Sequence, residues 1–397
     1  MGTKENFNRN LVKGRENLIQ NVKLVLYKKD PQIFDKIDFE NDQIYLNPLL
    51  FAVLTSKKIN DFNQAIWHFC QETKIEINID ESGYIYISNL GFFHLEEKVG
   101  KVSFIKNNNF EIIFEGKLVK YKFEASKLIL SKFELLYHPV FLLNEHFFDE
   151  FGTNVPVEIT NTSKKFEPYL ITALNHIKNV NPEWYKLLEE NLKKIILFED
   201  KSGRRNSFAT QSVHGCIFLN CFQDNYNEVF FIEDIAHQAG HVIFNTFLAS
   251  NPNIYKCDKN HEIFLNREID EYNEPRELYV MIHAMYTYES ILQCFVKCLD
   301  NNIFSGSKRH ELLGRIKYTL YKFLRDFELL SINDEQGKNI FFTDEGLEIL
   351  NWFKETFILV CNKYGDELDL VDISNQPYNF SYSKFLELNP LFENEII

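Results

Sequence analysis

KIEINIDESGYIYISNL, residues 74–90, decides the fold, because here the apolar residues change from helical spacing to strict alternation. Ile75, Ile77 and Ile79 alternate with polar residues, and Gly83 separates this run from a second one, YIYI. Alternation with a period of two places every second side chain on one face of a strand. The stretch therefore predicts two short strands joined by a turn.

Similar segments continue to about residue 130. The runs KVSFIKN, FEIIFEG and LVKYKFEA are rich in Ile, Val, Tyr and Phe, and Gly, Asn and Asp separate them. This pattern is typical of an antiparallel meander, so we expect residues 74–130 to form one sheet. On the amino-terminal side, apolar residues such as Phe62, Ile66 and Phe69 recur at helical spacing. The first 70 residues are predicted to be mainly helical.

Helical periodicity dominates after residue 150. FEPYLITALNHIKNV and EWYKLLEENLKKIILF predict helices, although KKIILFE and the later HGCIFLN could be strands that pair beside the next long helix. Further helices are expected at about 228–249, 275–300, 308–330 and 344–363. The sequence thus predicts an α+β fold. An N-terminal antiparallel β-meander with helices would span residues 1–150, and a mainly helical domain would span residues 151–397.

Composition excludes several classes of partner. The chain of 397 residues has 43 Lys and Arg against 57 Asp and Glu, a formal charge of -14 that repels a phosphate backbone, so no nucleic acid is expected. No apolar run approaches the roughly 20 residues that cross a bilayer, and the start lacks the apolar stretch of a signal peptide. Seven scattered cysteines indicate reduced thiols. We expect a soluble, cytoplasmic protein with no membrane partner.

The motif HQAGH, residues 237–241, lies in the apolar run FFIEDIAHQAGHVIFNTFLA. In a helix, His237 and His241 lie one turn apart on the same face, so their imidazoles can converge on one ion. Two buried imidazoles are hard to satisfy without an ion or a dedicated hydrogen-bond network. The pair therefore predicts a metal-binding helix, and the alternative is a purely structural pair.

A third ligand is expected on another segment, NEPRELYVMIHAMYTYESI, which contains His283. We predict that Pro275 lies in the first turn of a helix on which Tyr279, His283 and Tyr286 share a face. The alternative for His283 is a core histidine bonded to a carbonyl group. Glu262, next to His261, is the rival ligand, and it would complete a triad of two histidines and one carboxylate.

Arg276 precedes His283 by seven residues, about 10 Å along a helix, and its side chain can span part of that distance. Its guanidinium could bind the far carboxylate of a dicarboxylic co-substrate whose other end chelates the metal. Alternatively, Arg276 pairs with an acidic residue of the preceding segment, Glu268, Asp270 or Glu271. The side chains expected to contact the substrate are Gln238, Tyr279 and Tyr286.

Gln238 stands where a zinc peptidase with an HExxH helix has its catalytic glutamate. A neutral amide cannot take a proton from a metal-bound water, and loss of such a base costs on the order of a hundredfold in rate. Three protein ligands on Fe(II) leave positions for a 2-oxoacid and dioxygen, and oxidation by that set needs no protein base. The sequence therefore favours an iron-dependent oxygenase over a peptidase.

The chain resembles the HExxH-motif peptide-modification proteins of ribosomal peptide biosynthesis, a family of iron and 2-oxoglutarate-dependent peptide β-hydroxylases. The likeness covers residues 205–350 and comprises SFATQSVHGCIFLN, IAHQAGHVIFNTFL, EPRELYVMIHAMYTYESI and FFTDEGLEIL. It implies His237, His241 and His283 as iron ligands, whereas Arg276 as the 2-oxoglutarate anchor follows mainly from charge and spacing. The chain departs from the family at Gln238, where the family has Glu.

The predicted function is therefore an Fe(II) and 2-oxoglutarate-dependent dioxygenase. It would use dioxygen to hydroxylate a side chain, at the β-carbon by resemblance, of a ribosomally made precursor peptide. The sheet within residues 1–150 could bind that peptide by adding its leader as an edge strand, or it could be plain scaffold. One alternative is a non-catalytic binding protein derived from a metallopeptidase-like scaffold. Another is a zinc metallohydrolase in which Asp234 or Glu233 replaces the missing base.

Overall fold

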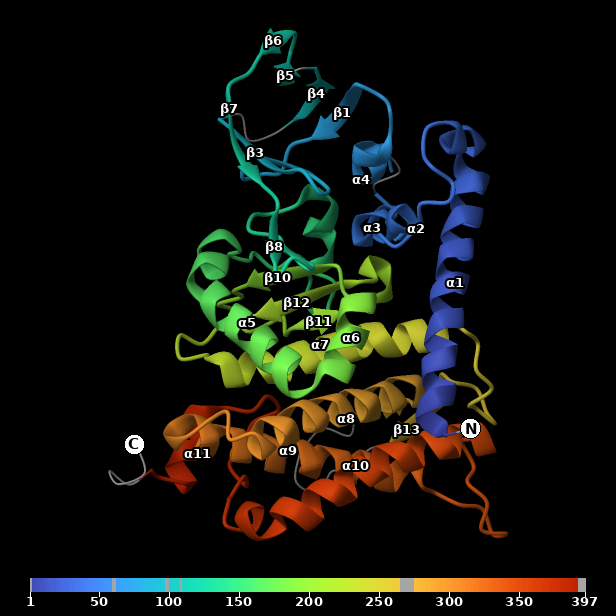
Figure 1. Cartoon of the computed structure of the whole chain (residues 1–397), viewed down its shortest axis with the longest axis vertical. Coiled ribbons are helices and arrows are strands. Elements are labelled where there is room, and N and C mark those ends of the chain that lie inside the picture. Colours follow the sequence, from blue (N-terminus) through green and yellow to red (C-terminus); the bar gives the residue numbers. More distant parts are fainter. Residues whose placement is uncertain (1, 59–61, 97–99, 108, 265–274, 392–397) are drawn as a thin grey trace. The chain divides into compact units, whose positions relative to one another are not determined.

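The computed structural model describes residues 2–58, 62–96, 100–107, 109–264 and 275–391. Antiparallel strands occupy the amino-terminal half and helices the carboxyl-terminal half, which confirms the α+β fold (Figure 1). The chain divides into two compact units. The first contains residues Met1–Val12, Thr172–Leu187 and Asn227–Ile397, and the second contains Lys13–Ile171 and Leu188–Tyr226. This division differs from the expected single boundary near residue 150, because a later strand returns to the sheets of the second unit.

In the second unit, helices precede the first strands, as expected for the first 70 residues. These are the main part of α1 (Thr3–Lys29), then α2 (Asp42–Tyr45), α3 (Pro48–Thr55) and α4 (Asn63–Ile66). Short 3₁₀ helices span Pro31–Asp35, Trp67–Phe69, Phe141–His146 and Gln211–Val213. Asn47 caps α3, because its side-chain oxygen accepts a hydrogen bond from the Leu49 amide at 3.1 Å. Pro48 then fits the first helical position, where no amide hydrogen is needed.

The meander forms more than one sheet, so the prediction of a single sheet over residues 74–130 is wrong. One sheet has the order β1-β4-β5-β6 and another the order β2-β3-β7, both antiparallel. Their strands are β1 (Lys74–Asn78), β2 (Tyr84–Ile87), β3 (Gly91–Leu95), β4 (Lys101–Lys106), β5 (Phe110–Phe114), β6 (Lys117–Leu118) and β7 (Tyr121–Ala125). Both sheets bury apolar side chains in one shared core, which includes Ile77, Phe93 and Phe104. Alternation identifies a strand, but it does not identify the neighbouring strand.

A third sheet of the second unit has the order β11-β12-β10-β9-β8. Its strands are β8 (Lys127–Ile129), β9 (Phe133–Leu135), β10 (Lys194–Phe198), β11 (Phe208–Ala209) and β12 (Cys216–Asn220). The predicted pairing of the IILF and CIFLN runs is confirmed, and β10 is parallel to both β9 and β12. Every residue of β10 and β12 is buried, as is usual for parallel strands. The buried Lys194 pairs with Glu134 of β9.

The first unit is mainly helical. It contains parts of α5 (Thr160–Val180) and α6 (Pro182–Asn191), then α7 (Glu228–Leu248), α8 (Leu278–Asp300), α9 (Gly306–Leu330), α10 (Asp344–Asp369) and α11 (Tyr382–Leu388). A short hairpin of β13 (Glu262–Phe264) and β14 (Pro275–Glu277) precedes α8. The prediction that Pro275 lies in the first turn of a helix is wrong, because residues 275–277 form a strand and the helix begins at Leu278. In the described part of the chain, no helix has both the length and the apolar composition needed to cross a membrane.

Helices α7 and α8 pack closely against one another. A Cβ atom added to Gly240 of α7 would lie 3.2 Å from Cγ2 of Thr287 on α8. Asn227 caps the start of α7 by accepting a hydrogen bond from the Val229 amide at 2.7 Å. Farther along, Phe244 of α7 and Tyr286 of α8 stack with ring centres 5.2 Å apart. These contacts hold the facing surfaces of α7 and α8 together, and the candidate site lies on those surfaces.

Candidate metal centre

A narrow stripe of α7 is partly exposed, whereas most of the helix is buried. The stripe consists of residues at four-residue spacing: Glu233, His237, His241 and Asn245. Side chains four residues apart lie above one another on a helix. The expected histidine face of the helix is therefore present, and carboxylate and amide groups extend it at either end.

The three predicted metal ligands lie together. The ring centres of His237 and His241 are 5.1 Å apart, and those of His241 and His283 are 5.7 Å apart. His283, on α8, is 4% exposed, and its Nε2 atom has no hydrogen-bond partner among the described residues. Phe244 packs edge-on against the His283 ring, with centres 4.8 Å apart. A buried imidazole nitrogen without a partner is costly, which favours a bound ligand at this position.

All three imidazoles favour the neutral form. Burial lowers the pKa of His237 and of His283 well below the ordinary value, and the neighbouring His241 lowers both further. Burial also lowers the pKa of His241 to about 4. Neutral imidazole is the form that binds a metal ion, because the lone pair of the ring nitrogen must be free. The protonation states therefore fit a set of metal ligands.

The spacing of the three rings is close to that of imidazole rings that share a metal ion. Since each nitrogen lies about 2.1 Å from the metal, such rings have centres about 4.5–5.5 Å apart. The measured 5.1 Å and 5.7 Å are close to that range. As the side chains stand, no three His, Cys, Asp or Glu groups of the described residues converge on one point. The donor types and their proximity fit a metal, and the rings would have to move from these positions to bind one.

Gln238 and the two residues that could replace a catalytic base are all engaged. The Gln238 amide donates a hydrogen bond to Oδ1 of Asp234 at 3.2 Å, and both side chains are buried. Glu233 pairs with Arg315 of α9, which is 3% exposed. The ion pair already occupies the Glu233 carboxylate. This arrangement argues against Glu233 as the substitute base of a hydrolase.

Arg276 comes from the hairpin strand β14 rather than from α8. Its guanidinium lies 3.8 Å from Asp326 of α9, which is fully buried and also binds Arg325 at 2.7 Å. The Tyr288 hydroxyl donates a hydrogen bond to the same carboxylate at 3.2 Å. The other acidic residues considered for Arg276, Glu268, Asp270 and Glu271, lie outside the described residues.

The two tyrosines predicted to contact substrate have different surroundings. Tyr279 packs on His283, with ring centres 4.4 Å apart, and its hydroxyl donates a hydrogen bond to Asn245 at 2.8 Å. It therefore joins the two histidine-bearing helices. Tyr286 is 1% exposed and lies in the aromatic core, with Phe7 and Phe244 each 5.2 Å away by ring centre. Tyr286 supports the site by packing.

The rival third ligand is not among the groups gathered around the histidines. Glu262 is exposed at the start of β13, opposite Glu277 of β14, and His261 beside it is also exposed.

Lys322 and Asp326 of α9 are charged residues near the site that sequence reasoning missed. A helical stripe through Arg315, Lys322 and Asp326 could have indicated them, because these positions recur at helical spacing.

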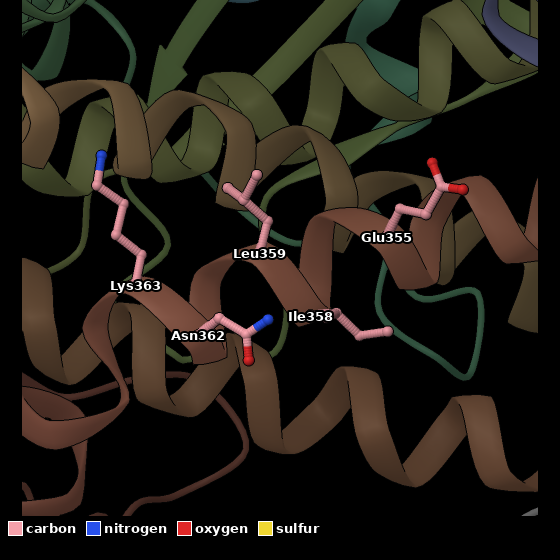
Figure 2. A pocket seen from close by; sticks show the side chains of 5 residues that line it. All are labelled: Glu355, Ile358, Leu359, Asn362 and Lys363. Carbon is pink, nitrogen blue, oxygen red and sulfur yellow. The ribbon is translucent and has the colours of Figure 1, made fainter.

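A shallow pocket lies elsewhere in the unit, along α10. Glu355, Ile358, Leu359, Asn362 and Lys363 line it, and all five come from that single helix (Figure 2). No candidate ligand or co-substrate residue belongs to it. The pocket therefore has no share in the metal-binding chemistry considered above.

Comparison of the sequence with models of known protein families finds no match, and comparison with curated proteins finds none either. Function is therefore inferred from the residues and their geometry, together with the resemblance described above.

Proposed function

We propose that the protein is an Fe(II) and 2-oxoglutarate-dependent oxygenase that hydroxylates a side chain, at the β-carbon, of a ribosomally made precursor peptide. The observation that carries the proposal is the cluster of three neutral imidazoles from α7 and α8. It includes a buried Nε2 atom of His283 that has no hydrogen-bond partner in the described part of the chain. His237, His241 and His283 would hold the iron. The bound iron and 2-oxoglutarate would supply the oxidising power.

The residues around this cluster have positioning roles. Tyr279 bonds to Asn245 and packs on His283, so it keeps the start of α8 in register with the histidine stripe of α7. Phe244 restricts the tilt of the His283 ring. Arg276 would bind the 2-oxoglutarate, and Asp326 orients its guanidinium. A site held by packed side chains on two helices has the rigidity that aligned reactants require.

Hydrolysis is the weaker candidate because, in the described part of the site, each group considered as a base is either an amide or already engaged. Gln238 cannot accept a proton, Glu233 is paired with Arg315, and Asp234 accepts a hydrogen bond from Gln238. A zinc enzyme would need one of these groups to take a proton from the bound water. Oxidation with a 2-oxoacid makes no such demand on the protein. The non-catalytic alternative does not explain what the buried Nε2 atom of His283 binds.

The proposal is tested by anaerobic addition of Fe(II) and 2-oxoglutarate to the purified protein. A weak charge-transfer band in the visible region is expected only when both are present, since it arises when the 2-oxoacid chelates the iron. The matched control is H283A, in which the band should be lost. If the wild-type protein gives no band, or if its zinc form cleaves peptides at a rate that H283A abolishes, the oxygenase proposal is wrong.

A further inference from the structure

Lys322 of α9 is a partly buried cation with no carboxylate of the described residues within 4.0 Å of its ammonium group. Its Nζ atom lies over two aromatic rings, 4.4 Å from the centre of Tyr318 and 5.4 Å from that of Tyr378. Burial lowers the pKa of Lys322 to about 8, so the amine is still mostly charged at neutral pH. A desolvated cation is costly unless an anion accompanies it, and aromatic faces compensate only in part.

The charges around Lys322 are unbalanced. The described cations of this cluster are Arg276, Arg315, Lys322 and Arg325, and the described carboxylates are Glu233, Glu311 and Asp326. Each carboxylate is within ion-pair distance of an arginine, which leaves the lysine as the surplus positive charge. The excess is notable because the whole chain carries a net charge of -14. A single added carboxylate would balance the cluster.

Ion pairs between α7 and α9 place Lys322 beside the histidine stripe. Lys308 pairs with Glu228, and Arg315 pairs with Glu233, so the two helices run in the same direction. Four residues beyond Glu233 comes His237, and seven residues beyond Arg315 comes Lys322. Both positions therefore lie beyond the Glu233–Arg315 ion pair in the same direction, which puts the surplus cation toward the His237 end of the cluster.

We propose that Lys322 binds the far carboxylate of the 2-oxoacid co-substrate and selects dicarboxylic over monocarboxylic 2-oxoacids. This inference rests on the proposed oxygenase function. A lysine suits the role because its ammonium is a compact charge on a flexible stem that can follow the ligand. Arg276 lies 3.8 Å from Asp326, whereas Lys322 has no carboxylate of the described residues within ion-pair distance and is therefore the cation available to the ligand.

The experiment measures binding rather than turnover. Anaerobic calorimetry with the Fe(II)-loaded full-length protein compares two probes, 2-oxoglutarate and pyruvate, a 2-oxoacid that lacks the far carboxylate. The variants are K322M, which keeps the stem and removes the charge, and K322R, which keeps a charge. K317M is the matched control, because Lys317 lies on the same helix and pairs with Asp369. Thermal unfolding of each variant checks that the fold is retained.

We expect K322M to weaken 2-oxoglutarate binding by about tenfold to a hundredfold, the effect of losing one charge-assisted hydrogen bond. K322R should lose less, K317M should match the wild type, and pyruvate binding should be unaffected by K322M. Equal 2-oxoglutarate affinity in K322M and the wild type would overturn the role of Lys322 and leave the oxygenase proposal intact. Equal losses for both probes would also overturn it, since the lysine would then act on the fold. If the wild type binds neither probe, the oxygenase proposal itself fails.

Discussion

His241 and His283 face one another across the contact between α7 and α8, with ring centres 5.7 Å apart and ring planes at 25°. The two residues are distant in sequence, and their proximity depends on the close packing around Gly240. His283 is buried and His241 only partly exposed, so a metal ion that bound them would replace few hydrogen bonds to water. The relationship makes the helix pair, rather than the HQAGH motif alone, the unit that would bind a metal.

Replacing His283 with Ala should reduce the affinity for Fe(II) by at least about tenfold, because one of three nitrogen donors is lost. Bound iron is measured by elemental analysis after anaerobic titration and desalting. The comparison variant is E262A, which removes the rival ligand at an exposed position. If E262A loses iron and H283A retains it, the third ligand is the carboxylate.

Gly240→Ala tests whether the approach of the two helices matters. Ala is favoured over Gly in a helix by up to about 1 kcal/mol, but here the new methyl group would press on Thr287, one turn beyond His283. We expect no gain in stability and weaker iron binding. Gly365→Ala on α10 is the control, since its methyl group would meet no atom within 4 Å and should stabilise the protein by about 1 kcal/mol. Equal stabilisation by both variants would show that the helix contact is loose.

The shared face of His237 and His241 could be predicted from the sequence because helical periodicity is local, whereas the proximity of His283 depends on the packing of α8 against α7. His237 and His241 share a face in any α-helix, and the apolar residues around them indicated burial. The setting of Arg276 could not be predicted, because Pro275 fits a first helical turn as well as an edge strand. The pairing of residues 275–277 with 262–264 decided between them. Lys322 could not be recognised from the sequence because its position near the histidines depends on the packing of α9 against α7, two helices distant in sequence.

For the fold too, features that depend on local sequence pattern could be predicted, whereas features that depend on pairing between distant segments could not. Strand alternation located β1 to β5 well, and two apolar runs indicated β10 and β12 and their pairing, although not its parallel direction. The number of sheets did not follow, since alternating strands with similar apolar faces can pair in several orders. Likewise, the return of β10 to β9 assigns residues 188–226 to the unit that holds the meander. Sequence spacing alone gave no sign of that return.

Gln238→Glu should destabilise the metal-free protein rather than create a peptidase. The new carboxylate would lie near Asp234, at a contact now 3.2 Å long, and would replace a hydrogen bond by like-charge repulsion in a buried place. A cost of about 1–3 kcal/mol is expected in urea unfolding. The double variant D234N/Q238E restores an amide next to a carboxylate and should recover most of the loss. If Q238E is as stable as the wild type, the two side chains do not interact.

Tyr279 and Asn245 form a hydrogen bond of 2.8 Å between α8 and α7, which a double-mutant cycle can measure. Removing the hydroxyl in Y279F, or the amide in N245A, should each destabilise the protein. The coupling energy between them should be about 0.5–1.5 kcal/mol. Because this bond holds Tyr279 against His283, both single variants should also lower iron affinity. Additive effects on stability would mean that the bond contributes nothing.

Glu289 gives the first unit a dependence of stability on pH that is independent of the metal. This carboxyl group is 1% exposed on α8, where Gln293 donates a hydrogen bond to it and Thr356 donates another at 3.3 Å. Burial raises the pKa of Glu289 to about 7, from an ordinary value near 4.5. Between these values the folded protein holds a proton that the unfolded chain releases. Stability should therefore fall as pH rises from about 4.5 to 7 and change little above that range.

The prediction is measured as the difference in unfolding free energy between E289Q and the wild type. That difference should grow with pH in favour of E289Q, reaching up to about 3 kcal/mol above pH 7. The difference is needed because the buried histidines act in the opposite sense: their lowered pKa values reduce stability as pH falls below their ordinary range. E355Q, at an exposed carboxylate of α10 (Figure 2), is the control and should show no such trend. A pH-independent difference for E289Q would mean that Glu289 is ionised in the folded protein, with its charge balanced by the surrounding polar groups.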